Sequence, residues 1–173
     1  MKEQASRIQR IVLIAIFTLS FSLIGILTVV NNGSANDYHY EVSEIIYHSG
    51  ELPEPNDCWQ CYHPLLYHNL VAKLWHLFGA ETDQDLRLLL SQLPNGIAGF
   101  LTILIFWLFI RRQDFRMPVK LASFALVALN PRLIAISSQP SNDAFVILFG
   151  ALTIYSLWQL MKRPAPLWLL LLC

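Results

Sequence analysis

Residues 11–30, IVLIAIFTLSFSLIGILTVV, decide what class of protein this is. These twenty residues carry no charge, and a helix of that length crosses a hydrocarbon core of about 30 Å. The segment follows Lys2, Arg7 and Arg10, so a signal peptide is the competing interpretation. The apolar region of a cleavable signal is usually about 7–15 residues long. We therefore predict a retained membrane anchor.

The composition of the whole chain agrees with a membrane protein. Of its 173 residues, 55% are hydrophobic and only 14% are charged, whereas a soluble domain carries about 25% charged residues. Further apolar segments predict spans at 88–110, 121–137 and 144–160, and the start of a fifth at 167–173. We expect an all-α fold, a polytopic helical membrane protein with four full spans plus a truncated fifth. Residues 1–173 form a single membrane domain in this interpretation.

The last apolar run, WLLLLC, is too short to cross a membrane. We therefore expect the chain to be the N-terminal piece of a larger protein.

The charges divide between the two sides that these spans define. Nine Lys and Arg residues share the side of the N-terminus with Glu3 and Asp114, while three share the other side with the remaining ten carboxylates. Short cytoplasmic loops are enriched in Lys and Arg. The pattern predicts a multi-pass protein of the cell membrane with a cytoplasmic N-terminus and an extracytoplasmic loop at 31–87.

That loop concentrates the groups capable of chemistry. Residues 31–85 hold all five histidines and nine of the twelve carboxylates. The tetrapeptide SAND, residues 34–37, has the form of a capping box and predicts a helix from about Ala35 to His48, ended by Gly50. Pro64 suits the first turn of a second helix, 63–78. This helix is too short to span, and we expect it to lie on the outer leaflet.

Asp37 and Glu41 lie one helical turn apart at the end of the first span. A carboxylate beside a like charge, or partly buried, can accept a proton from a substrate hydroxyl. A helix cap followed by a solvated acidic face is the structural alternative. The spacing by itself favours that alternative.

Cys58 and Cys61 form a C-x-x-C pair in the same loop. Outside the cytoplasm such a pair forms a disulfide, works as a redox couple, or ligates metal, here with His63 and His39. No regular second half of a zinc site accompanies the pair. A disulfide that braces a tight turn is the favoured interpretation, and a divalent metal is left open.

The segment QPSNDAF, residues 139–145, follows the third predicted span and the tripeptide NPR at 130–132. Asn142 or Asp143 can cap the fourth span. Alternatively, charged groups at this depth face a cavity, where the planar guanidinium of Arg132 suits a phosphate. The sequence does not separate these two interpretations.

Taken together, these motifs resemble the multi-spanning GT-C glycosyltransferases, which include the protein O-mannosyltransferases and the aminoarabinose transferase of lipid A. The chain has an N-terminal anchor, an acidic D-x-H helix, a G-x-L-P turn, a segment similar to W-Q-x-Y-H/Q-P-P-L-Y-Y, and S-N-D-A at the head of a later span. The matching residues are Asp37, His39, Tyr40, Gly50, Leu52, Pro53, Trp59, Gln60, Tyr62, His63, Pro64, Leu66, Tyr67, Ser141, Asn142, Asp143 and Ala144.

The resemblance implies transfer of a hexose or pentose from a polyprenyl-phosphate carrier in the membrane lipid to an acceptor, of unknown identity, on the extracytoplasmic side. It implies that Asp37, with Glu41, is the catalytic carboxylate. The residues that it implies in substrate binding are His39, His63, Tyr67, Arg132, Asn142 and Asp143. No nucleic acid and no certain cofactor follow from it.

Three departures from the family pattern stand out. Asn36-Asp37 replaces an acidic pair common among relatives, and Leu65 and His68 replace a proline and a tyrosine. The later spans, which help to bind the carrier lipid, are not in the chain, so we do not expect these residues to be a working enzyme by themselves. Two other functions are considered: a membrane thiol–disulfide oxidoreductase that uses Cys58 and Cys61, and a non-catalytic binding or scaffold subunit.

Overall fold

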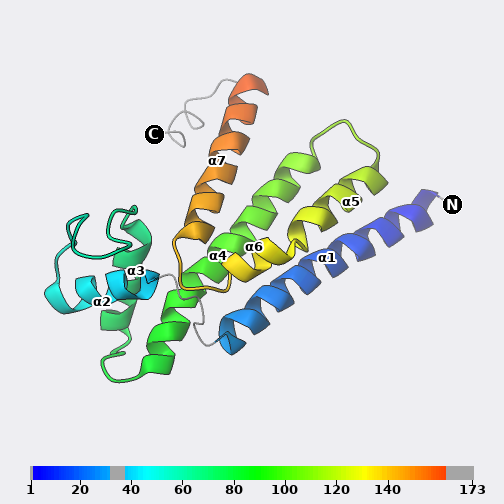
Figure 1. Ribbon diagram of the computed structural model, residues 1–173. Coiled ribbons are helices and arrows are strands. Elements are labelled where there is room, and N and C mark those ends of the chain that lie inside the picture. Colours follow the sequence, from blue (N-terminus) through cyan, green and yellow to red (C-terminus); the bar gives the residue numbers. More distant parts are fainter. Residues whose placement is uncertain (1, 32–37, 163–173) are drawn as a thin grey trace.

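A computed structural model describes residues 2–31 and 38–162, and the regular secondary structure of these residues is all helix, joined by turns and loops (Figure 1). It confirms the predicted all-α, polytopic fold. The helices are α1 (Lys2–Val30), α2 (His39–Ser49), α3 (Leu66–Leu77), α4 (Gln84–Ile110), α5 (Met117–Ala128), α6 (Pro131–Ile136) and α7 (Asp143–Lys162).

Three helices are long and apolar enough to cross a membrane, namely α1, α4 and α7. They coincide with the first, second and fourth predicted spans. α4 begins at Gln84, one turn before the predicted 88, because the Asp83 carboxylate accepts a hydrogen bond of 3.0 Å from the Leu86 amide. The predicted start of a fifth span, 167–173, lies outside the described residues.

The third predicted span, 121–137, is not one continuous helix. α5 ends at Ala128 and α6 begins at Pro131. The Asn130 side chain accepts hydrogen bonds from the amides of Arg132 and Leu133, at 2.9 and 3.2 Å. An N-cap asparagine followed by proline starts a new helix and interrupts the old one. The segment is therefore two short helices, and α5 has only 12 residues.

α4 is the central helix, and α1, α5, α6 and α7 all pack against it. Aromatic rings fill the space between α1, α4 and α5, with the Phe124 ring 4.7 Å from Phe17 and 5.2 Å from Trp107. Gly99 of α4 faces Ser137, and a Cβ atom on Gly99 would overlap the Ser137 hydroxyl. The glycine thus permits the segment after α6 to approach the α4 backbone.

The loop unit, residues 38–83 between α1 and α4, contains α2 and α3, which pack on each other and beside the start of α4 (Figure 1). Gly50 follows the end of α2 as predicted, and Gly79 lies shortly after the end of α3. Both glycines have positive φ angles, 72° and 63°. α3 begins at Leu66, after the predicted 63, because turns at Cys58–Cys61 and Gln60–His63 precede it.

α3 has two apolar faces. Tyr67, Val71 and Trp75 are buried in the loop unit, whereas Leu66 and Leu77 are exposed. Leu66 and Leu77 therefore point away from the protein, and the aromatic face holds α3 to α2 and α4.

Arg87 of α4 fastens the loop unit to the bundle. Its guanidinium donates hydrogen bonds to the carbonyls of Ala80 and Glu81, at 2.6 and 2.7 Å. It also lies over the rings of Tyr47 and Trp75, 4.8 and 5.2 Å from their centroids. These contacts join α2, α3 and the α3–α4 connection to one side chain.

The opposite end of the bundle collects the start of α1, the α4–α5 connection and the end of α7 (Figure 1). Arg111, Arg112, Lys120 and Lys162 belong to this end. Arg112 donates to the Tyr155 hydroxyl at 3.0 Å and so joins α4 to α7 there. The fold therefore separates a basic end from the end that bears the acidic, histidine-rich loop unit.

Candidate functional site

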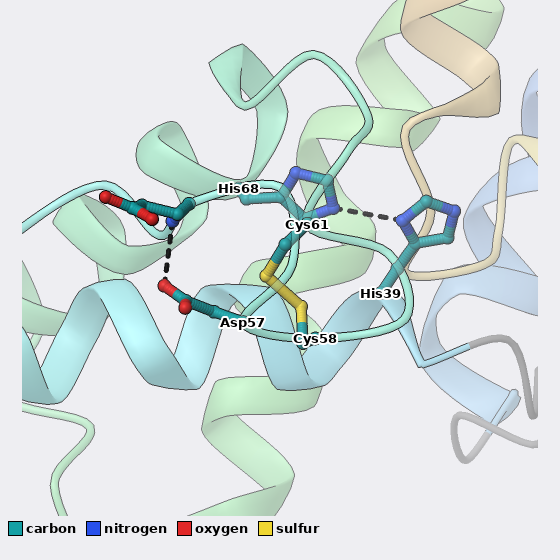
Figure 2. Close-up of a disulfide and its surroundings, with 6 residues drawn as sticks. His39, Asp57, Cys58, Cys61 and His68 are labelled. Carbon is teal, nitrogen blue, oxygen red and sulfur yellow. Dashed lines mark hydrogen bonds between the residues drawn. A yellow bond between two sulfur atoms is a disulfide. The ribbon is translucent and has the colours of Figure 1, made fainter.

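Three histidines from distant parts of the loop unit lie together, and we call His39, His63 and His68 the histidine cluster. His39 Nδ1 and His68 Nε2 are 3.0 Å apart (Figure 2). These two rings are stacked, with centroids 5.2 Å apart and planes inclined by 20°. The His63 ring lies 5.4 Å from that of His39. The contact between His39 and His68 joins the first turn of α2 to the first turn of α3.

The histidine pair is shielded from water. His39 is 4% exposed and His68 is fully buried. Burial, reinforced by the neighbouring His39 and His63, lowers the pKa of His68 to about 3. His68 is therefore neutral at physiological pH, and the contact with His39 is a hydrogen bond between imidazoles, of which at least one is uncharged.

The cysteine pair forms a disulfide beside the cluster (Figure 2), with an S–S distance of 2.03 Å. The preceding turn is closed by the Glu54 amide, which donates to the Asp57 carboxylate at 2.8 Å. Two sulfurs bonded to each other are not thiolate ligands. Among the described residues, no group of three or more His, Cys, Asp or Glu side chains has a geometry that suits a metal ion.

A second polar group, which we call the polar layer, consists of Asn31, Gln92 and Asn95. Asn31 donates to the Ser138 carbonyl at 3.1 Å, and Gln92 donates to the Asn31 carbonyl at 2.6 Å. The fully buried Asn95 donates to the carbonyls of Gln139 and Ser141. These bonds hold the connection between α6 and α7 against α1 and α4, and so place the start of α7.

At the start of α7, the first helical hydrogen bonds are made to the backbone carbonyl of Asn142 and not to its side chain. The Asn142 carbonyl accepts from the amides of Phe145 and Val146, each at 3.1 Å. The Asn142 side chain is buried, whereas Asp143 is exposed. Arg132, in the first turn of α6, is exposed as well.

The other predicted site residues occupy different environments. Asp37 lies outside the described residues. Glu41 is exposed in the first turn of α2. Tyr67 is buried, and its hydroxyl donates to the Ser91 carbonyl at 2.9 Å.

The structure thus brings His39 and His63 together, and it joins the histidine cluster to the bundle through Tyr67. The Tyr67 ring lies 5.6 Å from Phe145, two residues after Asp143. Within residues 38–162, no hydrogen bond or ion pair links Arg132 or Asp143 to the cluster.

Three residues that position these groups are not among the site residues predicted from the sequence. In the sequence, His68 stands out only as a departure from a family tyrosine, although its neighbours Tyr67, Val71 and Trp75 repeat at four-residue intervals and mark a buried face. Asn95 carries a usable signal, because an amide inside an apolar span must find partners. For Arg87, the sequence offers no signal of a positioning role beyond the charge of the side chain.

Comparison with known proteins identifies the family of this chain. A family model described as dolichyl-phosphate-mannose-protein mannosyltransferase matches residues 62–173. The chain belongs to this family. No curated protein and no solved structure matches it.

This mannosyltransferase-family protein is therefore a multi-pass membrane glycosyltransferase of the mannosyltransferase type, in agreement with the resemblance seen in the sequence. The matched region includes His63, His68, Arg132, Asn142 and Asp143, and it begins after Asp37 and His39.

Proposed function

We propose that this mannosyltransferase-family protein transfers a sugar, a hexose in the first instance, from a polyprenyl-phosphate carrier to an acceptor on the extracytoplasmic side of the cell membrane. The observation that carries the proposal is the family match over residues 62–173, whose description names a dolichyl-phosphate sugar donor and a protein acceptor. A protein hydroxyl is accordingly the acceptor that we propose.

The proposed orientation places the N-terminus in the cytoplasm and the loop unit outside. Two features at opposite ends of the fold support it. Basic residues concentrate at the end that holds the α4–α5 connection, as in cytoplasmic loops. The Cys58–Cys61 disulfide lies at the other end, and disulfides persist in oxidising, extracytoplasmic compartments.

In the reaction, the acceptor oxygen forms a bond to the anomeric carbon of the sugar. The bond from that carbon to the carrier phosphate breaks, and the phosphate leaves with the electron pair. The acceptor hydroxyl must lose a proton, for which we propose Asp37 as the base, with Glu41 one turn away. A correctly placed general base contributes about 10²–10⁴-fold to the rate.

The leaving phosphate needs a cation, and we propose Arg132. Its guanidinium is exposed and makes no hydrogen bond or ion pair with the described residues. Arginine binds phosphate oxygens in a planar, bidentate manner. We propose that His39, His63, Tyr67, Asn142 and Asp143 also contribute to the substrate site.

The test is an assay of the full-length protein with a radiolabelled polyprenyl-phosphate hexose. We expect Asp37→Asn to lower the rate of transfer by about 100-fold or more. Glu51→Gln is the matched control, because Glu51 is an exposed carboxylate of the same loop unit, and it should leave the rate unchanged. Equal rates for Asp37→Asn and wild type would remove Asp37 from the chemistry.

A further inference from the structure

We propose that a cavity at the basic end of the bundle binds the headgroup phosphate of an anionic phospholipid. The cavity has a volume of about 440 Å³ and is lined by Arg112, Trp158, Gln159 and Lys162. Sites for small molecules have volumes of about 300–1,000 Å³. Binding at this end, opposite to the histidine cluster, depends neither on sugar transfer nor on which side of the membrane the end faces.

The cavity lies where two spans leave the membrane (Figure 1). α4 ends at Ile110, and Arg112 belongs to the connection that follows. α7 has 20 residues and ends at Lys162, so its length of about 30 Å equals the thickness of the hydrocarbon core. Lys162 is therefore at the level of the lipid headgroups. Trp158 lies one turn earlier, and tryptophan is enriched at this boundary between lipid and water.

The cavity has an excess of positive charge. Arg112 and Lys162 are both exposed, and neither forms an ion pair with a carboxylate among the described residues. The C-terminal end of a helix carries about half a negative elementary charge. The ends of α4 and α7 therefore offset about one of the two positive charges. The remaining charge suits a monovalent anion such as a phosphodiester, and basic pockets between spans are known to bind lipid phosphates.

Hydrogen bonds hold Arg112 in place without a ligand. Its guanidinium donates to the Tyr155 hydroxyl at 3.0 Å, and the same hydroxyl accepts a second bond from Gln159 Nε2 at 2.8 Å. Tyr155 and Gln159 are 9% and 8% exposed, so this part of the network is shielded from water. A guanidinium has five N–H donors, and the bond to Tyr155 uses one of them. The exposed side of Arg112 can therefore donate to phosphate oxygens in a bidentate manner.

Trp158 adds an apolar wall to the cavity. Its ring lies 5.3 Å from that of Phe109 and 5.9 Å from that of Tyr155, and these contacts limit its movement. An inorganic phosphate ion would contact only the two cations. A phospholipid would also place its glycerol and acyl chains against the indole, which adds a hydrophobic contribution to binding. The combination of cations and indole therefore favours a lipid over the free ion.

The test is lipid binding to the full-length protein in detergent, measured by native mass spectrometry. Phosphatidylglycerol and phosphatidylcholine with the same acyl chains are added separately. The two lipids share a phosphodiester and differ in net charge, so the comparison separates recognition of an anion from general lipid adhesion. Inorganic phosphate is added alone and as a competitor. We expect phosphatidylglycerol to bind more tightly than phosphatidylcholine and to persist when inorganic phosphate is present.

Arg112→Gln and Lys162→Gln should each weaken phosphatidylglycerol binding by about tenfold or more, the effect of losing a hydrogen bond to a charged group. Arg116→Gln is the matched control, because it removes a positive charge from an exposed position at the same end but outside the cavity. Tyr155→Phe changes no charge and removes the hydroxyl that holds Arg112. It should weaken phosphatidylglycerol binding by about two- to tenfold.

Equal affinity for the two lipids would overturn the proposal, as would equal losses in Arg112→Gln and Arg116→Gln. Unchanged affinity in Tyr155→Phe would also overturn it, because charge alone would then attract the lipid. Displacement of phosphatidylglycerol by an equal concentration of inorganic phosphate would assign the cavity to a free anion instead. Lys162→Gln, at an exposed position, decides if Arg112→Gln does not fold.

Discussion

At the scale of single residues, burial of His68 makes the free energy of unfolding depend on pH. His68 has no exposure to water, and its pKa is lowered to about 3 from an ordinary value of 6.5. The unfolded chain therefore binds a proton to this residue more readily than the folded protein does. The contribution of neutral His68 to the free energy of unfolding is fully present above about pH 6.5 and is lost as the pH falls toward 3.

We expect the melting temperature of the purified protein to fall more steeply between pH 7 and pH 5 in wild type than in His68→Gln, which has no titrating ring. One proton contributes a slope of at most about 1.4 kcal/mol per pH unit. Thermal unfolding in detergent at several pH values measures the difference. Parallel curves for the two proteins would contradict a neutral, buried His68.

At the scale of elements, the position of α7 depends on how closely its preceding connection approaches α4. Asn95 holds that connection by its carbonyls, and Gly99 leaves room for Ser137. Both residues act on the chain just before α7 and so determine where that helix begins.

The glycine supplies a sharp test. Gly99→Ala should lower the melting temperature through overpacking, which costs about 1–3 kcal/mol, and a second change, Ser137→Gly, should restore part of the loss. Gly150→Ala in α7 is the control, because an added Cβ atom there would meet nothing within 4 Å, and alanine favours a helix by about 1 kcal/mol. A Gly99→Ala protein as stable as wild type would show that the contact with Ser137 relaxes freely.

At the scale of the whole molecule, the two ends of the bundle differ in chemistry. One end has the basic α4–α5 connection, and the other has the loop unit with its disulfide and histidine cluster. Arg87 and Tyr67 join the loop unit to α4, so the proposed substrate residues of the loop are held in a fixed relation to the spans.

Cysteine labelling measures the proposed sidedness. In a Cys173→Ser background, Glu51→Cys should react with a membrane-impermeant maleimide in intact cells. Asp114→Cys, in the α4–α5 connection, should react only after the membrane is permeabilised. Both positions are exposed, so accessibility within the protein does not differ between them. The reverse pattern would overturn the proposed orientation.

Local properties of the sequence determined the helical membrane class, the three long spans, the glycine end of α2, and the separation of charges. Hydropathy over about 20 residues, caps and turns depend on neighbours in the chain, and they are readable without a fold. The α5–α6 break was also local, since Asn130-Pro131 is a helix-start signal, but the apolar run around it concealed the interruption.

Only the tertiary structure decided which polar groups meet. His39 and His68 are 29 residues apart, and Asn95 and Ser141 are 46 apart. No spacing rule connects such positions, because their distance is set by the packing of α2 on α3 and of the α6–α7 connection on α4. The sequence by itself determined where the chain enters the membrane and which family pattern it resembles, whereas the pairing of His68 with His39 followed from the packing that buries them both.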